Sequence, residues 1–127
     1  MSTDPAAPRQ ATGGPWIEET ELAAPLVISI EPADALVRLR VAGELDMSTA
    51  PGLLARIEAL AAAGSPRLVV DLTALIFCDS AGLTTFVRGD RRCMEAGGWL
   101  RLTGARGQVA RVIDISGVAD ALGYRPS

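Results

Sequence analysis

The stretch of residues 68–87, LVVDLTALIFCDSAGLTTFV, constrains the fold more than any other part of the sequence. It begins as a run of apolar and β-branched residues interrupted only by Asp71, which is typical of a strand buried on both faces. After Gly82 the spacing of apolar residues changes to that of an amphipathic helix. The apolar stripe of this helix would consist of Leu83, Phe86, Val87 and Met94. A buried strand that leads directly into such a helix predicts an α/β protein.

Asp79 and Ser80 stand at the junction between the expected strand and the expected helix. Both residue types are good helix N-caps, so we expect the helix to begin here. A serine hydroxyl is thereby presented at a helix N-terminus, where free N–H groups and the helix dipole favour negative charge. This geometry is suited to carrying a phosphoryl group.

The residues before this stretch predict a β-hairpin and a helix. Apolar residues alternate with polar ones over residues 26–30 and again over residues 37–41, with a turn expected at residues 32–34. This alternation predicts two antiparallel strands with one face against the core and the other in water. Ser48 or Thr49 can cap the next helix, which has a proline in its first turn and Gly64 at its end. Its expected buried stripe consists of Leu53, Leu54, Ile57, Leu60 and Ala61.

The residues after the serine-bearing helix predict three further elements. Two glycines close that helix, and residues 99–103 alternate as another strand. Val109, Val112 and Ile113 indicate a short helix that ends near Gly117, and residues 121–125 are expected to add a short edge strand. The order is therefore a β-hairpin followed by β-α crossovers, which predicts a single α/β domain with a mixed sheet and helices mainly on one face.

Length and charge narrow the classes of function. The 127 residues suffice for one domain, and the net charge of −3 without a basic run argues against a nucleic-acid partner. No stretch is long and apolar enough to predict a membrane span, and the first residues lack the apolar core of a signal peptide, so we expect a cytoplasmic protein without a membrane partner. Residues 1–22 show no periodicity and are expected to form a disordered N-terminal tail.

The chain contains no histidine and no lysine, since all 12 basic residues are arginine. Catalysis by Ser-His-Asp or Cys-His, a phosphate loop with lysine and a histidine-built zinc site are therefore excluded, and so is a receiver domain, which relies on a lysine. Cys78 and Cys93 would lie roughly 20 Å apart along the helix at 1.5 Å per residue, too far for a disulfide. We expect two reduced thiols, no metal site and no cofactor.

Two classes of enzyme would place a nucleophile at this strand-to-helix turn. A serine hydrolase needs Gly-x-Ser-x-Gly, but Cys78 stands at the first glycine position and no histidine is present to act as base. A cysteine phosphatase needs an arginine six residues after its cysteine, where this chain has Thr84. We therefore expect a protein that is not an enzyme.

Three segments together resemble the STAS domain family, in particular its anti-sigma factor antagonists, also called anti-anti-sigma factors. These segments are GELD at residues 43–46, LVVDL at residues 68–72 and DSAGL at residues 79–83. The resemblance covers residues 26–124 in the same order of elements, and it assigns residues 23–127 to one STAS domain. Relatives usually continue into a terminal helix, which this chain is expected to lack. Ala81 stands where a second serine is common, so Ser80 is the only hydroxyl of the motif.

The resemblance implies a mechanism of partner switching in bacteria. In this family the unphosphorylated antagonist binds an anti-sigma factor, often a GHKL-type serine kinase, and so releases a sigma factor. The kinase phosphorylates the motif serine, and a PP2C-type phosphatase reverses the modification. Carried over, Ser80 would be the phosphorylation site and Asp79 its acidic neighbour, with Asp46 close to the same edge of the sheet. The implied partner-binding residues are Asp46, Asp79, Ser80, Ala81 and Gly82.

Alternative interpretations remain for these residues. Asp79 and Ser80 could form a plain N-cap, and Asp46 could serve only a turn. Asp71 is expected to accept hydrogen bonds at the end of the sheet. The arginines at 88, 91 and 92 are typical of a solvated helix face, and the alternative is that they rim a partner site. A STAS domain can also serve as a non-phosphorylated accessory subunit of a phospholipid-transport ABC complex, which would bind an ATPase stably and leave Ser80 unmodified.

Overall fold

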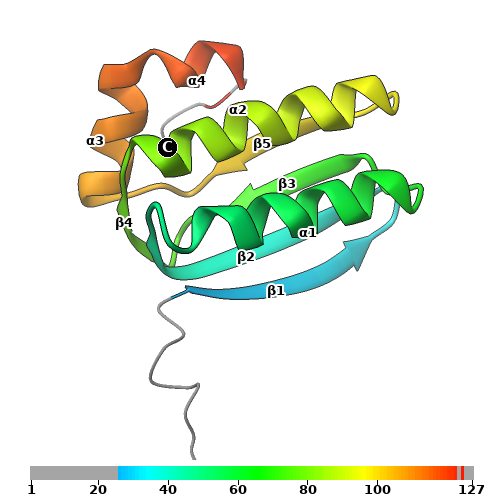
Figure 1. Cartoon of the computed structure of the whole chain (residues 1–127), viewed down its shortest axis with the longest axis horizontal. Coiled ribbons are helices and arrows are strands. Elements are labelled where there is room, and N and C mark those ends of the chain that lie inside the picture. The colour runs from blue at the N-terminus through cyan, green and yellow to red at the C-terminus, as the bar shows by residue number, and fades with distance from the viewer. Residues whose placement is uncertain (1–25, 123, 125–127) are drawn as a thin grey trace, which may run out of the picture.

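A computed structural model describes residues 26–122 and residue 124 (Figure 1). The expected tail at residues 1–22 lies outside these residues. In chain order the elements are β1 (Leu26–Ala33), β2 (Leu36–Leu45), α1 (Ala50–Ala62), β3 (Arg67–Asp71), β4 (Leu75–Cys78), α2 (Ser80–Glu95), β5 (Trp99–Thr103), α3 (Gly107–Ser116) and α4 (Val118–Ala121). None of these helices has the length and apolar composition needed to cross a membrane.

The five strands form one mixed sheet. β1 and β2 make the expected antiparallel hairpin, in which Leu26 lies opposite Gly43 and Ala33 opposite Leu36. The other strands are parallel to their neighbours, and the strand order is β1-β2-β3-β5, with β4 paired to β2. The mixed sheet predicted from the hairpin and the crossovers is confirmed.

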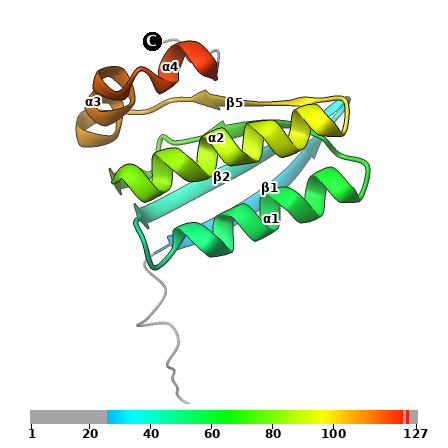
Figure 2. The ribbon, with the colours of Figure 1, turned by 45° about the horizontal axis from the view of Figure 1, so that its top comes forward.

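Helices α1 and α2 lie side by side across one face of the sheet, as both views show (Figures 1 and 2). They enclose a core that includes Leu39, Leu53, Ile57, Phe86 and Leu100, all fully buried. α3 contacts β4, and α4 contacts α2 and α3. The prediction that the helices lie mainly on one face is confirmed.

Burial alternates along the strands, as expected for a sheet with one covered face. In β2, Val37, Leu39 and Val41 are buried, while Arg40 between them is exposed. The expectation that the central strand is buried on both faces is wrong. Leu68 and Val70 of β3 are buried, but Val69 and Asp71 point the other way and are half-buried, because α1 and α2 cover only one face.

Strand β4 was not predicted, because residues 68–78 read as one strand. The structure interrupts this run with a turn, in which the Asp71 carboxylate accepts hydrogen bonds from the Thr73 N–H (2.9 Å) and the Thr73 hydroxyl. These bonds confirm the expected role of Asp71 at the end of the sheet. β3 pairs with the first half of β2 and β4 with its last residues, after an irregularity in the register at Gly43. The run therefore supplies two short strands to the same neighbour.

The buried face of α2 differs from the predicted stripe. Leu83 and Val87 are half-buried, and Met94 is 61% exposed. The buried positions are Gly82, Thr85, Phe86, Gly89 and Cys93. The reason is close packing, since a Cβ atom at Gly89 would lie 3.1 Å from side-chain atoms of both Ile57 and Leu100. Phe86 is buried as predicted, and small residues occupy the other buried positions of α2.

The last element that the structure describes is a helical turn, where an edge strand was predicted. α3 has the expected position and is followed by Gly117, but Ala121 then belongs to α4. The amide of Tyr124 donates a hydrogen bond to the carbonyl of Ala119 (2.9 Å), and the Tyr124 side chain is buried. The strand predicted at residues 121–125 is therefore wrong over its described part, since Gly123 and Arg125 lie outside the described residues.

Candidate functional site

The carboxyl ends of β2 and β4 lie next to each other and bring two acidic turns together. Leu45, the last residue of β2, pairs with Cys78, the last residue of β4. The ladder continues for one more bond, because the Asp79 amide donates to the Leu45 carbonyl at 3.2 Å. Asp46 and Asp79 each follow one of these paired residues, so they occupy the same edge of the sheet, as the sequence predicted.

Asp79 is the N-cap of α2. Its backbone is extended (φ −112°, ψ −169°), and its carboxylate accepts hydrogen bonds from the amides of Ala81 (2.9 Å) and Gly82 (3.2 Å). These are two of the N–H groups that a helix leaves without partners at its start. The predicted cap is confirmed, and it belongs to Asp79 rather than to Ser80.

Replacing Asp79 with alanine should lower the free energy of unfolding by about 0.5–2 kcal/mol, since both capping bonds are lost. Asp79→Asn keeps an oxygen that can accept them and should cost much less. Urea unfolding of the two variants measures the difference. If asparagine proved as damaging as alanine, the carboxylate would act through its charge and not as a cap.

Ser80 is the first residue of α2 and is exposed. Its backbone carbonyl accepts a hydrogen bond from the Thr84 hydroxyl (2.9 Å). Within the described part of the chain, the Ser80 hydroxyl has no hydrogen-bond partner. The side chain is therefore available to solvent, at the end of the helix where backbone N–H groups point outward.

The rest of the DSAGL motif turns into the protein. Ala81 is half-buried, and Gly82 is buried. A Cβ atom at Gly82 would lie 2.6 Å from the Cys78 sulfur and 2.9 Å from the side chain of Leu45. Gly82 therefore allows α2 to begin directly against the ends of β2 and β4, beneath the surface that carries Ser80.

Asp46 organises the turn between β2 and α1. Its carboxylate accepts hydrogen bonds from the hydroxyl and the amide of Ser48 (2.8 and 2.9 Å) and from the amide of Thr49 (3.1 Å). The Ser48 hydroxyl bond is the main cause that lowers the pKa of Asp46, with the backbone bonds to Ser48 and Thr49 adding to it. Asp46 is therefore a stable anion beside the motif serine.

Neither predicted cap of α1 acts through its side chain. Thr49 occupies the N-cap position without a capping bond. Its hydroxyl instead donates to the Glu44 carbonyl (3.0 Å) and accepts from the Asp46 amide (2.9 Å). Pro51 lies in the first turn of α1 as expected. The two hydroxyl residues thus hold the Asp46 turn against the end of β2.

Gln108, at the start of α3, was missed in the sequence. Its side-chain amide pairs with both backbone groups of Cys78, accepting from the Cys78 N–H and donating to the Cys78 carbonyl, each at 2.9 Å. It thus continues the sheet beyond β4 and holds the strand that leads into Asp79 and Ser80. No local pattern marks such a residue, because its partner lies 30 positions earlier in the chain.

Gln108→Ala should lower the free energy of unfolding by about 1–2 kcal/mol, because two half-buried backbone groups lose their partner. Gln108→Glu offers a sharper test. A carboxylate can accept from the Cys78 N–H but cannot donate to its carbonyl, and protonation near pH 4.3 restores a donor. Because only the neutral carboxyl can donate to the Cys78 carbonyl, its pKa should be raised in the folded state, and the deficit of this variant relative to the parent protein should shrink as the pH falls toward about 4.3 and stay constant below it. A deficit that is constant with pH would contradict the donor role.

Exposed apolar side chains lie on the two segments that form the site. Met47, in the Asp46 turn, is 79% exposed, and Ile76 of β4 is 68% exposed. Phe77, opposite Glu44 in the ladder, is also exposed. Single exposed apolar residues are common, but their concentration beside a polar site is typical of an interaction surface. No pattern in the sequence marked these residues as exposed.

The three arginines singled out in the sequence lie on the outer surface of α2. Arg88, Arg91 and Arg92 are exposed on α2, as expected for a solvated helix face. Arg92 forms an ion pair with Glu58 of α1 (3.0 Å) and another with Glu95 (3.6 Å). These contacts tie the outer surfaces of the two helices together.

Both cysteines are free and buried. Burial is the main cause that raises the pKa of the Cys78 thiol to about 12 and that of Cys93 to about 11, with Asp79 and Asp90 respectively adding to the effect. Both sulfurs are therefore protonated at neutral pH and are poor nucleophiles. Among residues 26–122 and 124, no group of three or more His, Cys, Asp or Glu residues is placed to hold a metal ion.

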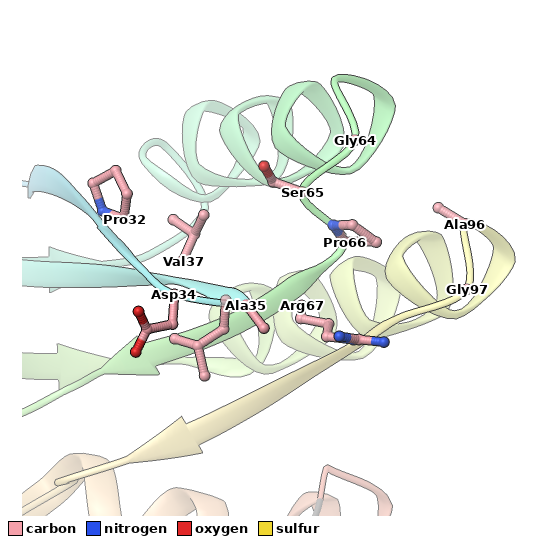
Figure 3. Close-up of a pocket in the computed structure, with 11 residues that line it drawn as sticks. Pro32, Asp34, Ala35, Val37, Gly64, Ser65, Pro66, Arg67, Ala96 and Gly97 are labelled. Carbon is pink, nitrogen blue, oxygen red and sulfur yellow. The ribbon is translucent and has the colours of Figure 1, made fainter.

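A pocket of about 540 Å³ lies at the opposite end of the sheet, where the parallel strands begin (Figure 3). It is formed by the β1–β2 turn, the loop after α1 and the end of α2. Asp34 and Arg67 are its charged residues. None of the site residues described above lines this pocket, so it is separate from the Ser80 surface.

The fold and the site together define a class: a small mixed α/β module that presents an exposed serine at the start of a helix, at the edge of the sheet that also carries the Asp46 turn. Comparison with known proteins agrees with it. The family model described as "Mlab, STAS domain" matches residues 28–124. The chain therefore belongs to the STAS domain family, as its three motifs indicated.

Individual relatives include anti-sigma factor antagonists. The anti-sigma-B factor antagonist of Bacillus subtilis is 31% identical over 86 residues, which cover 68% of this chain and 78% of that protein. The crystal structure of an anti-sigma factor antagonist from Mycobacterium paratuberculosis is 31% identical, with a TM-score of 0.68 over 80% of this chain and 86% of that one. The unphosphorylated antagonist SpoIIAA shares the fold, with a TM-score of 0.69, 20% identity and coverage of 80% and 88%.

Proposed function

We propose that this protein is an anti-sigma factor antagonist controlled by phosphorylation of Ser80. In its unphosphorylated form it binds an anti-sigma factor, a GHKL-type serine kinase, and so releases a sigma factor. Phosphorylation of Ser80 ends this binding, and a PP2C-type phosphatase restores it. The names of the relatives support the class of function. The observation that carries the switch is the exposed Ser80 at the first position of α2.

The environment of Ser80 suits a reversible modification. The side chain is exposed at a helix N-terminus, so a kinase can reach the hydroxyl without unfolding the helix. The helix dipole favours the added negative charge, while Asp46 and Asp79 at the same edge oppose it. Because Asp79 is already engaged with two amides, the helix start does not depend on the serine hydroxyl.

The proposed partner surface consists of Asp46, Asp79, Ser80 and Ala81, with Gly82 packed beneath them. The exposed Met47 and Ile76 extend it with apolar area. A partner that covers this surface removes apolar side chains from water and contacts the serine at the same time. Binding would then be sensitive to a charge on Ser80. In this proposal the protein acts by binding and not by catalysis, and it works in the bacterial cytoplasm.

Affinity capture from the native cytoplasm, followed by mass spectrometry of the captured protein, tests the proposal. We expect an anti-sigma factor with a kinase domain among the captured proteins and a phosphorylated fraction at Ser80. A stable complex with a transporter ATPase, together with an unmodified Ser80, would contradict it. That outcome would instead identify an accessory subunit of a phospholipid-transport ABC complex.

A further inference from the structure

The sheet has a second face that α1 and α2 do not cover, called here the open face. It carries the side chains of β2, β3 and β5 that alternate with the buried ones. The outward-facing residues that define it are Arg38, Arg40, Arg67, Val69, Trp99 and Arg101. Their strands lie next to one another, so these side chains share one continuous surface. This surface combines arginines with half-buried apolar groups.

The open face is positively charged. Its four arginines outnumber the three acidic residues that face the same way, Glu31, Glu44 and Asp71. Among the described residues only Arg40 of these arginines forms an ion pair, with Asp71 at a distance of 3.9 Å. The guanidinium of Arg101 lies 4.6 Å from the ring centre of Trp99. A ligand for this face therefore needs negative charge together with apolar side chains.

The chain itself contains a segment with this chemistry. Residues 26–127 hold eleven acidic residues and eleven arginines, so the net charge of −3 comes entirely from residues 1–25. Three of the acids there are Glu18, Glu19 and Glu21, within the sequence WIEETEL at residues 16–22. Trp16, Ile17 and Leu22 supply the apolar side chains. The segment is thus complementary to the open face in both respects.

The length of the connection permits this contact. The segment joins the domain at Leu26, the first residue of β1, which is the edge strand three places from β5. Neighbouring strands are about 4.8 Å apart, so β5 lies about 14 Å across the face. Nine or ten extended residues reach about 30 Å. From Leu26, Arg101 also lies five residues, about 17 Å, along the strands, or about 22 Å away in all, so the first half of the segment can reach β5 while Leu22 stays near β1 and β2.

We propose that residues 16–22 dock on the open face of the same chain. A short linker raises the effective concentration of the segment to the millimolar range, which favours this contact over the same contact between two copies. The contact relies on ion pairs at the surface, so salt should weaken it. The open face lies on the sheet itself, so the inference does not depend on the role of Ser80.

Nuclear magnetic resonance of the full chain tests this inference. Reversing the charge of the segment (Glu18→Lys, Glu19→Lys and Glu21→Lys) should shift the indole signal of Trp99 and the amides of the open face. Signals from the outer surfaces of α1 and α2 should stay in place. In 1 M salt the parent protein and this variant should become alike, because the Debye length falls to about 3 Å.

A reciprocal pair of variants completes the experiment. Arg38→Glu with Arg101→Glu should shift the indole signal of Trp16, whereas the matched change Arg88→Glu with Arg91→Glu on α2 should leave it unchanged. Open-face signals that do not respond to reversal of the segment would overturn the proposal. Shifts that depend on protein concentration would also overturn it, in favour of contact with a second copy.

Discussion

Gly82→Val is expected to lower the free energy of unfolding by about 3 kcal/mol, because the added carbons have no room at the start of α2. The first of them alone would lie 2.6 Å from the Cys78 sulfur and 2.9 Å from Leu45. Both neighbours are fully buried and held by their strands, so α2 must move away from the sheet. Gly82→Ala should show a smaller loss of about 1–2 kcal/mol, since alanine also improves helix propensity.

Gly52 of α1 provides a matched control. It is also a helical glycine, but a Cβ atom there meets nothing within 4 Å. Gly52→Ala should therefore stabilise the protein slightly, by up to about 1 kcal/mol. Urea unfolding of the three variants measures the series. If Gly82→Ala were as neutral or stabilising as Gly52→Ala, close packing would not explain the glycine of the motif.

The motifs predicted where Asp46 and Asp79 lie in the fold, because these residues follow the ends of neighbouring strands. The family resemblance implied that Asp46 and Asp79 lie close to one edge of the sheet, and the ladder from Leu45 to Cys78 brings them there. The N-cap role of Asp79 was also readable, since it depends only on residues two and three positions ahead. Local interactions of this kind are visible in a sequence.

The errors in the fold come from contacts that are distant in sequence. Residues 68–78 form one apolar run, and only their pairing with two different parts of β2 separates β3 from β4. The buried face of α2 was predicted from its large apolar residues. In the structure, Ile57 and Leu100 pack so closely against the helix that a glycine, Gly89, occupies one of the buried positions. At the end of α2 the buried position is Cys93, and its neighbour Met94 is exposed.

The C-terminal error has a different cause. Residues 118–122 contain small and apolar residues whose pattern is too short to separate a helical turn from a strand. The carbonyl of Val118 accepts the Leu122 amide at 3.0 Å, which makes the segment helical.

The role of Gln108 could not be predicted from the sequence either. A single glutamine at the start of a helix is not a recognisable motif, and its function follows only from the position of β4 beside it.

The switch at Ser80 is the second prediction with a large effect. Phosphorylation adds about −1.5 to −2 charges at pH 7. Within the domain this charge lies on an exposed side chain, and the helix N-terminus favours it by about 0.3–1 kcal/mol while Asp46 and Asp79 oppose it. The fold and the melting temperature should therefore change little.

At the partner surface the balance is different. A dianion must lose its hydration against a surface shaped for a neutral hydroxyl, and one poorly paired buried charge is enough to weaken binding strongly. A hundredfold loss of affinity corresponds to about 2.7 kcal/mol. We therefore expect phospho-Ser80 and Ser80→Asp to weaken partner binding by about that factor, whereas Ser80→Ala binds like the unphosphorylated protein and cannot be switched off.

Titration calorimetry of these variants against a captured anti-sigma partner measures the switch, with thermal unfolding as the check on the fold. Thr84→Asp is the matched control, because Thr84 is also exposed and lies one helical turn beyond Ser80. If this variant weakened binding as much as Ser80→Asp, the effect would reflect general charge repulsion and not the position of the serine. Equal affinities across the Ser80 variants would mean that the serine is no switch, and they would favour an accessory subunit whose partner binds regardless of charge at this position.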